Sequence, residues 1–516
     1  MSHLDASQAG QPQPPLEPTT TQPSALKGRK TLIFFAMLSS TLAILAAAPT
    51  VWAAATLRAR ASPQAFASSS DGSHKLSEID APVSGTGDAG GASTWKLSVK
   101  DTSGKKQTIT GFGATVTDAT VTVFNSLSSD KLSDLLNELV TPAGANFQLL
   151  RHTIASSDLS ADPAYSYDDN GGKADTDFKS FGLGDRGTAM AQMLKKLKGL
   201  QSDLTILGTP WSPPGWMKLN GVLMGNTQNN NLDPNHAGDF GKYLAKYLDA
   251  YKSQGVDIDA ITIQNEPLNS RPGMPTMYVF ADESGKLIQN NVGPALRDAG
   301  HKTTVWAYDH NTDKPEYPQT VLDEASEFVN AVAWHCYASS LDWGVLTDFH
   351  NKNPNVDQYM TECWTSSQTG WSQAADFTMG PLQNWARGAM AWTLGSDKNF
   401  GPHLSANDGP CTTCRGLVTV DTATGNYNFE VDYYMMAQFS KFMPKGAVVL
   451  DGTGSYSYGD GTGIQSVASV NPDGSKTVVI ENKFSNDVYV TVSLESGAQW
   501  SGSVLGNAVV TWVLPA

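Results

Sequence analysis

Short apolar runs alternate with longer amphipathic segments from residue 107 onward, and this alternation is the strongest constraint on the fold of the chain. In the segment 186–201, apolar residues recur at the spacing of one helical face, and Ser129–Val140 and 237–254 are further expected helices. Eight strands alternating with helices are typical of a (β/α)8 TIM barrel of the α/β class. The expected strands are 107–116, 146–154, 203–209, 258–266, 302–308, 329–337, 356–362 and 388–394.

The pattern changes after about residue 430. Val488, Val490, Val492 and Leu494 alternate with polar neighbours, as in a half-exposed strand, and no helical pattern appears in the last 65 or so residues. We therefore expect a catalytic barrel over 107–430 and an appended antiparallel β-sandwich over 431–516. Residues 93–106 are expected to add one or more N-terminal strands to the sandwich.

The composition of the N-terminus predicts a leader rather than part of a folded domain. Residues 1–30 are polar and rich in Pro, Gln and Thr, and residues 31–57 form an uncharged run preceded by Lys27, Arg29 and Lys30. The run is long enough to span a bilayer, and Val51-Trp52-Ala53 has the small residues that signal peptidase needs. Residues 1–57 are therefore a disordered leader with either a cleaved signal, which we favour, or an uncleaved membrane anchor. Residues 58–92, rich in Ser, Gly, Ala and Asp, are expected to be a flexible linker.

Charge and cysteine content restrict the possible partners. The formal net charge of -15 argues against nucleic acid as a partner, and we expect contact with a membrane only through an uncleaved anchor. No second Cys/His pair matches Cys411 and Cys414 as a zinc site, so we expect a local disulfide there and no metal. The pair Cys336 and Cys363 is either bridged or free, and export permits disulfides.

Two of the expected strands end in glutamate. The run 258–263 leads into Gln264-Asn265-Glu266-Pro267, and the run 356–360 leads into Thr361-Glu362-Cys363-Trp364. A charge at the end of a buried strand is costly unless function requires it. Two carboxylates on different strands of one barrel are the groups that hydrolysis of a glycosidic bond needs.

Polar and aromatic residues end several other strands, at the face where barrels carry their active sites. Acids and amides suit sugar hydroxyls, and indoles suit the faces of sugar rings. We expect the substrate to be bound by Asn265, Arg151, Asp158, Trp211, His335, Tyr337, Trp364 and Trp392. Arg151 has an alternative role, in which it binds Asp118 and only holds the barrel, and Trp211 has an alternative role in packing.

These motifs together resemble glycoside hydrolase family 30, whose members are retaining β-glycosidases built from a barrel and a β-sandwich. The resemblance covers roughly residues 95–516 and rests on the following segments: Gly111-Phe112-Gly113-Ala114, Pro210-Trp211-Ser212-Pro213-Pro214, Gln264-Asn265-Glu266-Pro267, His335-Cys336-Tyr337 and Thr361-Glu362-Cys363-Trp364. The glucosylceramidases of the family usually have Trp at the position of Cys336. With its Gly409-Pro410-Cys411-Thr412-Thr413-Cys414 segment, the chain is most similar to the fungal endo-β-1,6-glucanases.

The resemblance implies that Glu266 is the acid/base and Glu362 the nucleophile. For these roles Glu362 must be ionised and Glu266 must hold a proton, so we expect the neighbouring charge of Glu362 to raise the pKa of Glu266. Carboxyl groups about 5–5.5 Å apart favour a covalent glycosyl-enzyme and net retention. We expect Asn265 to bind the sugar 2-hydroxyl and Tyr337 to orient Glu362.

The leading functional hypothesis is hydrolysis of β-1,6-glucan outside the cell by a monomeric enzyme that needs no cofactor. One alternative is the same mechanism on another β-glycoside, namely glucosylceramide, β-1,6-galactan or xylan. The polar, Asn-rich segment 221–235 favours a hydrophilic polymer over a ceramide. A second alternative is a non-catalytic wall-binding barrel, which the presence of both glutamates disfavours.

Overall fold

The computed structural model describes residues 62–453, 455–458 and 460–516. The expected leader and hydrophobic run at 1–57 lie outside the described residues. Among the described residues, no helix combines the length and apolar character needed to cross a membrane. Two disulfides are present, Cys336–Cys363 and Cys411–Cys414.

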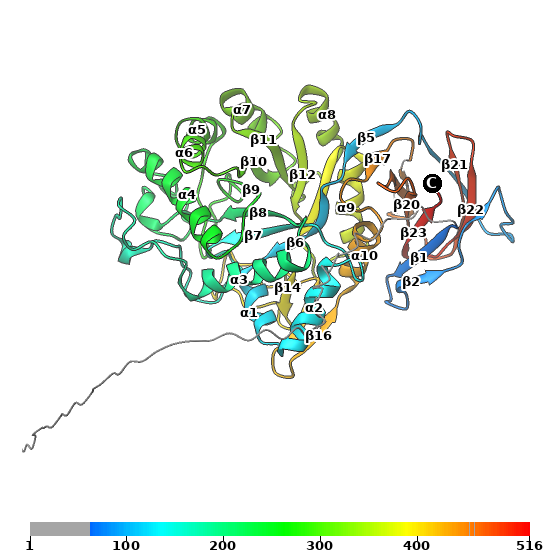
Figure 1. The fold of residues 1–516 in the computed structure, drawn as a ribbon, viewed down its shortest axis with the longest axis horizontal. Helices are drawn as coiled ribbons and strands as arrows, with labels where there is room; N and C mark the ends of the chain where they lie inside the picture. The colour runs from blue at the N-terminus through cyan, green and yellow to red at the C-terminus, as the bar shows by residue number, and fades with distance from the viewer. Residues whose placement is uncertain (1–61, 454, 459) are drawn as a thin grey trace, which may run out of the picture. The chain divides into compact units, whose positions relative to one another are not determined.

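Eight parallel strands close into a barrel, which confirms the predicted fold class (Figure 1). In the order around the barrel, each strand is hydrogen-bonded to the next, and β13 closes on β6. The strands are β6 (Gly111–Val116), β7 (Leu149–Ile154), β8 (Thr205–Pro210), β9 (Ala260–Ile261), β10 (Thr304–Asn311), β11 (Val329–His335), β12 (Asp357–Glu362) and β13 (Ala386–Ala391).

Helices connect the strands and cover the outside of the barrel (Figure 1). They are α1 (Asp118–Asn125), α2 (Ser129–Val140), α3 (Gly184–Leu200), α4 (Ala237–Ser253), α5 (Ala281–Leu287), α6 (Gly293–Asp298), α7 (Glu316–Ala325), α8 (Gly344–Lys352) and α9 (Gln373–Gln383). Short helical turns are η1 (Asn170–Gly172), η2 (Gly215–Met217), η3 (Pro234–His236) and η4 (Ile288–Val292). The Ser128 side chain caps α2 by accepting a hydrogen bond from the Lys131 amide, which fixes the start of that helix where the sequence predicts it.

Two apolar layers hold the barrel together. Inside it, small and large side chains interdigitate, and the rings of Trp306 and Tyr359 stack with centroids 4.0 Å apart. Outside it, the buried faces of the helices pack on the strands in one continuous core. The inside of the barrel is thus filled with side chains, as in other barrels of this kind.

The β-sandwich consists of two sheets. The larger has the order β2 (Lys75–Ile79), β1 (Gln64–Ser69), β23 (Ala508–Leu514), β20 (Lys476–Asn482), β19 (Gly463–Val470), β17 (Val448–Leu450) and β5 (Lys105–Thr108), with β18 (Ser455–Ser457) paired to β19. The smaller has the order β3 (Val83–Ser84), β22 (Gln499–Val504), β21 (Val488–Leu494) and β4 (Thr94–Val99).

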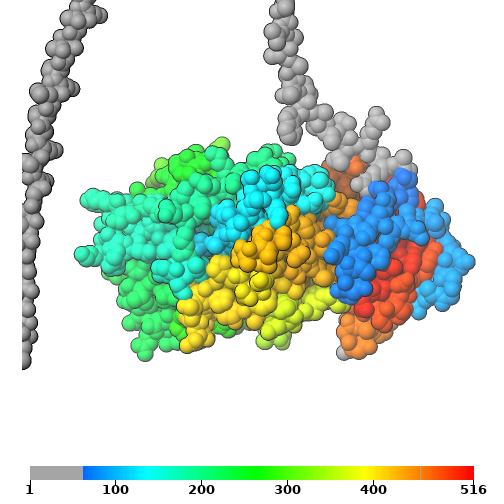
Figure 2. Space-filling view, turned by 90° about the horizontal axis from the view of Figure 1, so that it is seen from below, coloured from blue at the N-terminus to red at the C-terminus, as the bar shows by residue number. Residues whose placement is uncertain are grey.

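The structure contradicts the expected flexible linker over 58–92 in its described part. Residues 62–92 contain β1, β2 and β3, and β1 pairs along its whole length with β23 at the other end of the chain. Figure 2 shows the corresponding blue and red atoms in contact. The Ser- and Ala-containing segment that suggested a linker includes strand β1, whose Ala65 and Ala67 are fully buried.

The boundary between barrel and sandwich also differs from the expectation. Residues 431–440 form helix α10 (Val431–Ser440), which contacts α9 and β6 of the barrel as well as β1 and β23 of the sandwich. A small sheet of β14 (Gly395–Asp397), β15 (Val418–Asp421) and β16 (Asn426–Phe429) precedes it. The expected strand 107–116 is likewise split, because β5 belongs to the sandwich and β6 to the barrel.

Candidate active site

The carboxyl ends of the barrel strands surround a cavity of about 630 Å³. Each predicted site residue lies in one of these strands or in the loop that follows it. Eight of the ten line the cavity: Asp158, Trp211, Asn265, Glu266, Tyr337, Glu362, Trp364 and Trp392. The remaining two, Arg151 and His335, lie behind the cavity wall.

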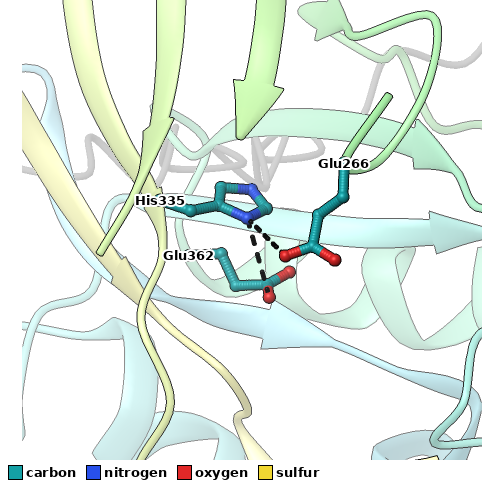
Figure 3. Close-up of side chains that lie close together, drawn as sticks. All are labelled: Glu266, His335 and Glu362. Carbon is teal, nitrogen blue, oxygen red and sulfur yellow. Dashed lines mark hydrogen bonds and ion pairs between the residues drawn. The ribbon is translucent and has the colours of Figure 1, made fainter. Parts of the chain in front are cut away.

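Glu266 and Glu362 face one another from different strands. Glu362 ends β12, and Glu266 follows β9 with a positive φ of 47°. An oxygen of each carboxylate and a nitrogen of His335 all lie within 4.8 Å of one another. Figure 3 shows the imidazole beside both carboxylates, with Nδ1 at 3.4 Å from Oε1 of Glu266 and 3.8 Å from Oε1 of Glu362. This spacing suits attack by one carboxylate on a sugar that the other protonates.

Arg151 fixes the orientation of Glu362 and Asn265. Its guanidinium donates to Oε2 of Glu362 at 2.6 Å and to the side-chain oxygen of Asn265 at 2.6 Å. Tyr337 donates its hydroxyl to the other oxygen of Glu362 at 3.0 Å. The alternative pairing of Arg151 with Asp118 does not occur, because Asp118 binds Arg186 instead.

A fully buried carboxylate, Asp309, joins these groups, and sequence reasoning did not assign it a role. It accepts hydrogen bonds from Arg151 at 2.9 Å and from Nε2 of His335 at 2.9 Å. Three threonine hydroxyls, of Thr209, Thr262 and Thr361, also donate to it. Burial opposes its ionisation, but the charge of Arg151 and the hydrogen bond from His335 hold the pKa of Asp309 well below its usual range. Its position near the end of β10 was the feature of the sequence that could have pointed to a role in the site.

His335 and Arg151 differ from their expected role as sugar contacts. Both side chains are fully buried, and neither lines the cavity. Each is a cation whose charge is balanced by the carboxylates around it, which is why burial is tolerated. Their hydrogen bonds therefore orient the two glutamates and their positive charges act on them, but neither side chain reaches a sugar in the cavity.

The pKa values of the carboxylate pair are in the reverse of the expected order. Burial opposes ionisation of Glu266, but a hydrogen bond from His335 and the charges of His310 and His335 lower its pKa to about 2. Burial, together with the charges of Glu266 and Asp309, raises the pKa of Glu362 despite Arg151 and His335. The expectation of a raised pKa for Glu266 in the free site is wrong, because the imidazolium outweighs the carboxylate.

His335 stays protonated at neutral pH. Burial alone would lower its pKa, but the charge of Glu362 and the hydrogen bonds with Asp309 and Glu266 raise it to about 9. Glu266, His335 and Glu362 are within reach of a single ion, and they are the only such group of three among the described residues. A doubly protonated imidazole has no lone pair for a metal, so the group is better suited to holding protons than to holding an ion.

Indoles and polar groups form the rest of the wall. The rings of Trp211 and Trp392 lie 5.2 Å apart, and the guanidinium of Arg151 lies 4.8 Å from the Trp211 ring, so Trp211 also packs within the wall. Asp158 is buried and has one oxygen, Oδ1, without a partner. Trp216 is not part of the wall, since it packs on Phe178 and His236.

Two further polar residues at the site were not among the predicted site residues. Asn269 donates to Oε2 of Glu266 at 2.6 Å, and His310 approaches Oε1 of Glu266 at 4.0 Å. Both line the cavity. Asn269 lies in the loop after β9, and His310 lies near the end of β10. Their positions after or at the ends of expected strands could again have pointed to a role in the site.

Comparison with known proteins gives a consistent result. The model of the glycosyl hydrolase family 30 TIM-barrel domain matches residues 109–443, and that of the family 30 beta sandwich domain matches residues 446–512. An endo-1,6-β-D-glucanase of Neurospora crassa is 65% identical, over 88% of this chain and 95% of its own length. One of Aspergillus fumigatus is 62% identical, over 90% of this chain and 96% of its own length. The solved structure of the endo-β1,6-glucanase BT3312 superposes with a TM-score of 0.77 at 24% identity, covering 88% of this chain and all of that one.

Proposed function

The chain belongs to glycosyl hydrolase family 30, and we propose that it cleaves internal β-1,6 linkages of glucan with retention of configuration. The observation that carries hydrolysis is the convergence of Glu266 and Glu362 across one cavity. The choice of polymer rests on the fungal relatives, which are more than 60% identical to this chain over most of their length.

In the proposed reaction, Glu362 attacks the anomeric carbon while Glu266 gives a proton to the leaving oxygen. Arg151 and Tyr337 each hold one oxygen of Glu362, so its attacking geometry is fixed before the sugar binds. In the second half, Glu266 takes a proton from water, and that water breaks the glycosyl ester. Asn265, oriented by Arg151, offers its amide to the 2-hydroxyl.

The proton needed for the first step is shared by the pair. At pH values between the low pKa of Glu266 and the raised pKa of Glu362, the two carboxyl groups together hold one proton. Catalysis uses the form in which this proton is on Glu266. A sugar that displaces water from Glu266 favours that form, because desolvation favours the neutral acid.

We also propose that the enzyme works outside the cytosol. The leader at 1–57 supports export, and two disulfides suit an oxidising compartment. The proposal is checked by identifying the N-terminus of the protein recovered from the medium of cells that express the full chain. Recovery of the whole chain in the cytosol would contradict it, whereas an uncleaved chain on the outer face of the membrane would identify the hydrophobic run as an anchor.

Product analysis on a panel of polymers tests the proposed activity. We expect β-1,6-linked pustulan to give oligosaccharides with a fast fall in polymer length, and β-1,3-linked laminarin to give little product. Proton NMR of the first products should show the β anomer before mutarotation. Release of glucose alone from chain ends, or preference for laminarin or xylan, would overturn the assignment of substrate and mode.

A further inference from the structure

The loop that connects β14 with β15 forms part of the cavity wall and contains the Cys411–Cys414 disulfide. Gly409, Cys411, Thr413 and Cys414 of this loop line the cavity. The segment 398–417 has no helix or strand of its own, and long loops of this kind are the mobile parts of most proteins. Here the disulfide closes its tip beside the catalytic groups, with the two Cα atoms 5.6 Å apart.

The loop holds Asp158 at two points. The backbone amide of Cys411 donates to Oδ2 of Asp158 at 3.0 Å, and that of Leu404 donates to the Asp158 carbonyl at 2.9 Å. Asp158 as a whole residue is 5% exposed, and its other carboxylate oxygen, Oδ1, is buried and has no hydrogen-bond partner. Because Asp158 lines the cavity, its carboxyl group is placed to bind a hydroxyl of the substrate.

The other end of the bridge is anchored in the site. Cys414 is buried in one apolar cluster with Trp211 and Trp392. Gly409 lies against the neighbouring loop so closely that a Cβ there would come within 2.2 Å of the Pro272 carbonyl oxygen. The tip of the loop is therefore held against the indoles on one side, and the disulfide ties the Cys411 amide to that anchor.

We propose that the Cys411–Cys414 disulfide is a positioning element for substrate binding, which fixes the Cys411 amide on Asp158 and so holds the Asp158 carboxyl group in place to bind a glucosyl hydroxyl. The inference rests on the proposed function and deepens it. A hydrogen bond to a sugar hydroxyl away from the reacting atoms is made in both the ground state and the transition state. Its loss raises KM and leaves kcat nearly unchanged.

The first experiment compares the wild-type enzyme with the double variant Cys411→Ser/Cys414→Ser on pustulan. We expect KM to rise about tenfold, the effect of losing about one hydrogen bond to the substrate, with kcat within about twofold. The matched control is Thr412→Ala, which changes the exposed residue between the cysteines and keeps the bridge. Circular dichroism and thermal unfolding verify that both variants are folded. An unchanged KM in the double variant would overturn the proposal.

A double-mutant cycle separates positioning of Asp158 from a general effect of the loop. Asp158→Asn alone should raise KM, and adding the two serines to it should raise KM by less than about twofold more, because their target has gone. Fully additive effects would show that the bridge does not act through Asp158. If the wild type does not cleave pustulan, the proposed substrate is wrong. The double-mutant cycle is then measured on the polymer that the enzyme does cleave.

If the double variant does not fold, mild reduction of the folded wild type replaces it. The dithiol reductant becomes a disulfide as the Cys411–Cys414 bond becomes two thiols. Cys411 is half-buried whereas Cys363 is fully buried, so this bridge should open first, and alkylation with mass mapping identifies it. KM should then rise as in the variant and return on reoxidation. A reduced bridge with unchanged KM would contradict the proposal.

Discussion

One imidazolium determines how the two catalytic carboxyls share their proton. His335 holds a charge next to both, and Asp309 behind it keeps that charge in place. The identities of Glu266 and Glu362 follow from charged residues that end apolar strands. Their pKa order does not follow from sequence, because it depends on a histidine 69 positions from Glu266 that folding brings within 3.4 Å.

Removing the acid should affect natural and activated substrates differently. We expect Glu266→Ala to lose at least about a hundredfold in kcat on pustulan but to keep measurable turnover on aryl β-glucosides with good leaving groups, because these need little protonation. Steady-state kinetics on both substrates check this. Glu362→Gln is the control and should be inactive on both. Equal losses of the Glu266 variant on the two substrates would argue against an acid role.

The charge of His335 should be visible in the acid limb of the kcat/KM profile. Activity falls at low pH when the pair takes up a second proton, and the imidazolium holds that pKa near 2. In His335→Gln the pKa of Glu266 should rise towards its ordinary value of 4.5, so the acid limb should move to higher pH. Profiles from pH 2.5 to 7 on an activated substrate measure the shift.

The matched control for this shift is Thr361→Val, which removes one donor to Asp309 and keeps the imidazolium. Its acid limb should stay near that of the wild type. If the limb of His335→Gln also stays in place, the low pKa has another cause. Thermal unfolding of both variants distinguishes loss of charge from loss of fold.

At the scale of elements, the sequence predicted those parts that bury a clear apolar pattern. All eight barrel strands are present, and α2 has the predicted bounds. Strand β9 is only two residues long, although the amides of Thr262 and Asn265 beyond it still donate to carbonyls of β8. Strand β1 was missed because its buried residues, Ala65 and Ala67, are small, and its partner lies at the opposite end of the chain.

The N-terminal strands should be essential for stability. A chain that starts at Ser93 lacks β1, and with it Ser68, which accepts a hydrogen bond from Gln438 of α10 at 2.7 Å. We expect this chain to be insoluble or to unfold at least about 5 °C below one that starts at Ser62, since β1 and β2 are lost from the larger sheet and β3 from the smaller one. Differential scanning calorimetry compares the two. Equal unfolding temperatures would support the linker interpretation instead.

At the scale of the described molecule, the barrel and the sandwich are in contact, and a buried acid lies close to this contact. Glu481 of β20 is fully buried, and neither of its carboxylate oxygens has a hydrogen-bond partner. The Lys483 ammonium lies 3.7 Å from Glu481 but donates to Asp376 of α9, across the contact. Burial and the charge of Asp376 raise the pKa of Glu481 well above 4.5. The sandwich is thus joined to the barrel through a carboxyl that resists ionisation.

This acid should make the enzyme less stable as the pH rises. A carboxyl whose pKa is higher in the folded state binds its proton more tightly there, so its contribution is fully present below pH 4.5 and is lost as the pH rises towards the folded pKa. Glu481→Gln stays neutral at every pH. We expect its unfolding temperature to match the wild type at pH 4 and to exceed it by about 2 °C or more at pH 8.

Thermal unfolding at intervals from pH 4 to 8 measures this difference, with Glu78→Gln on the exposed face of β2 as a control for loss of one negative charge. Only the difference between variant and wild type matters, because other groups contribute equally to both. A difference that is constant with pH would show that packing, not ionisation, separates the two proteins. A difference that grows with pH would show that ionisation of Glu481 weakens the packing of the sandwich on the barrel.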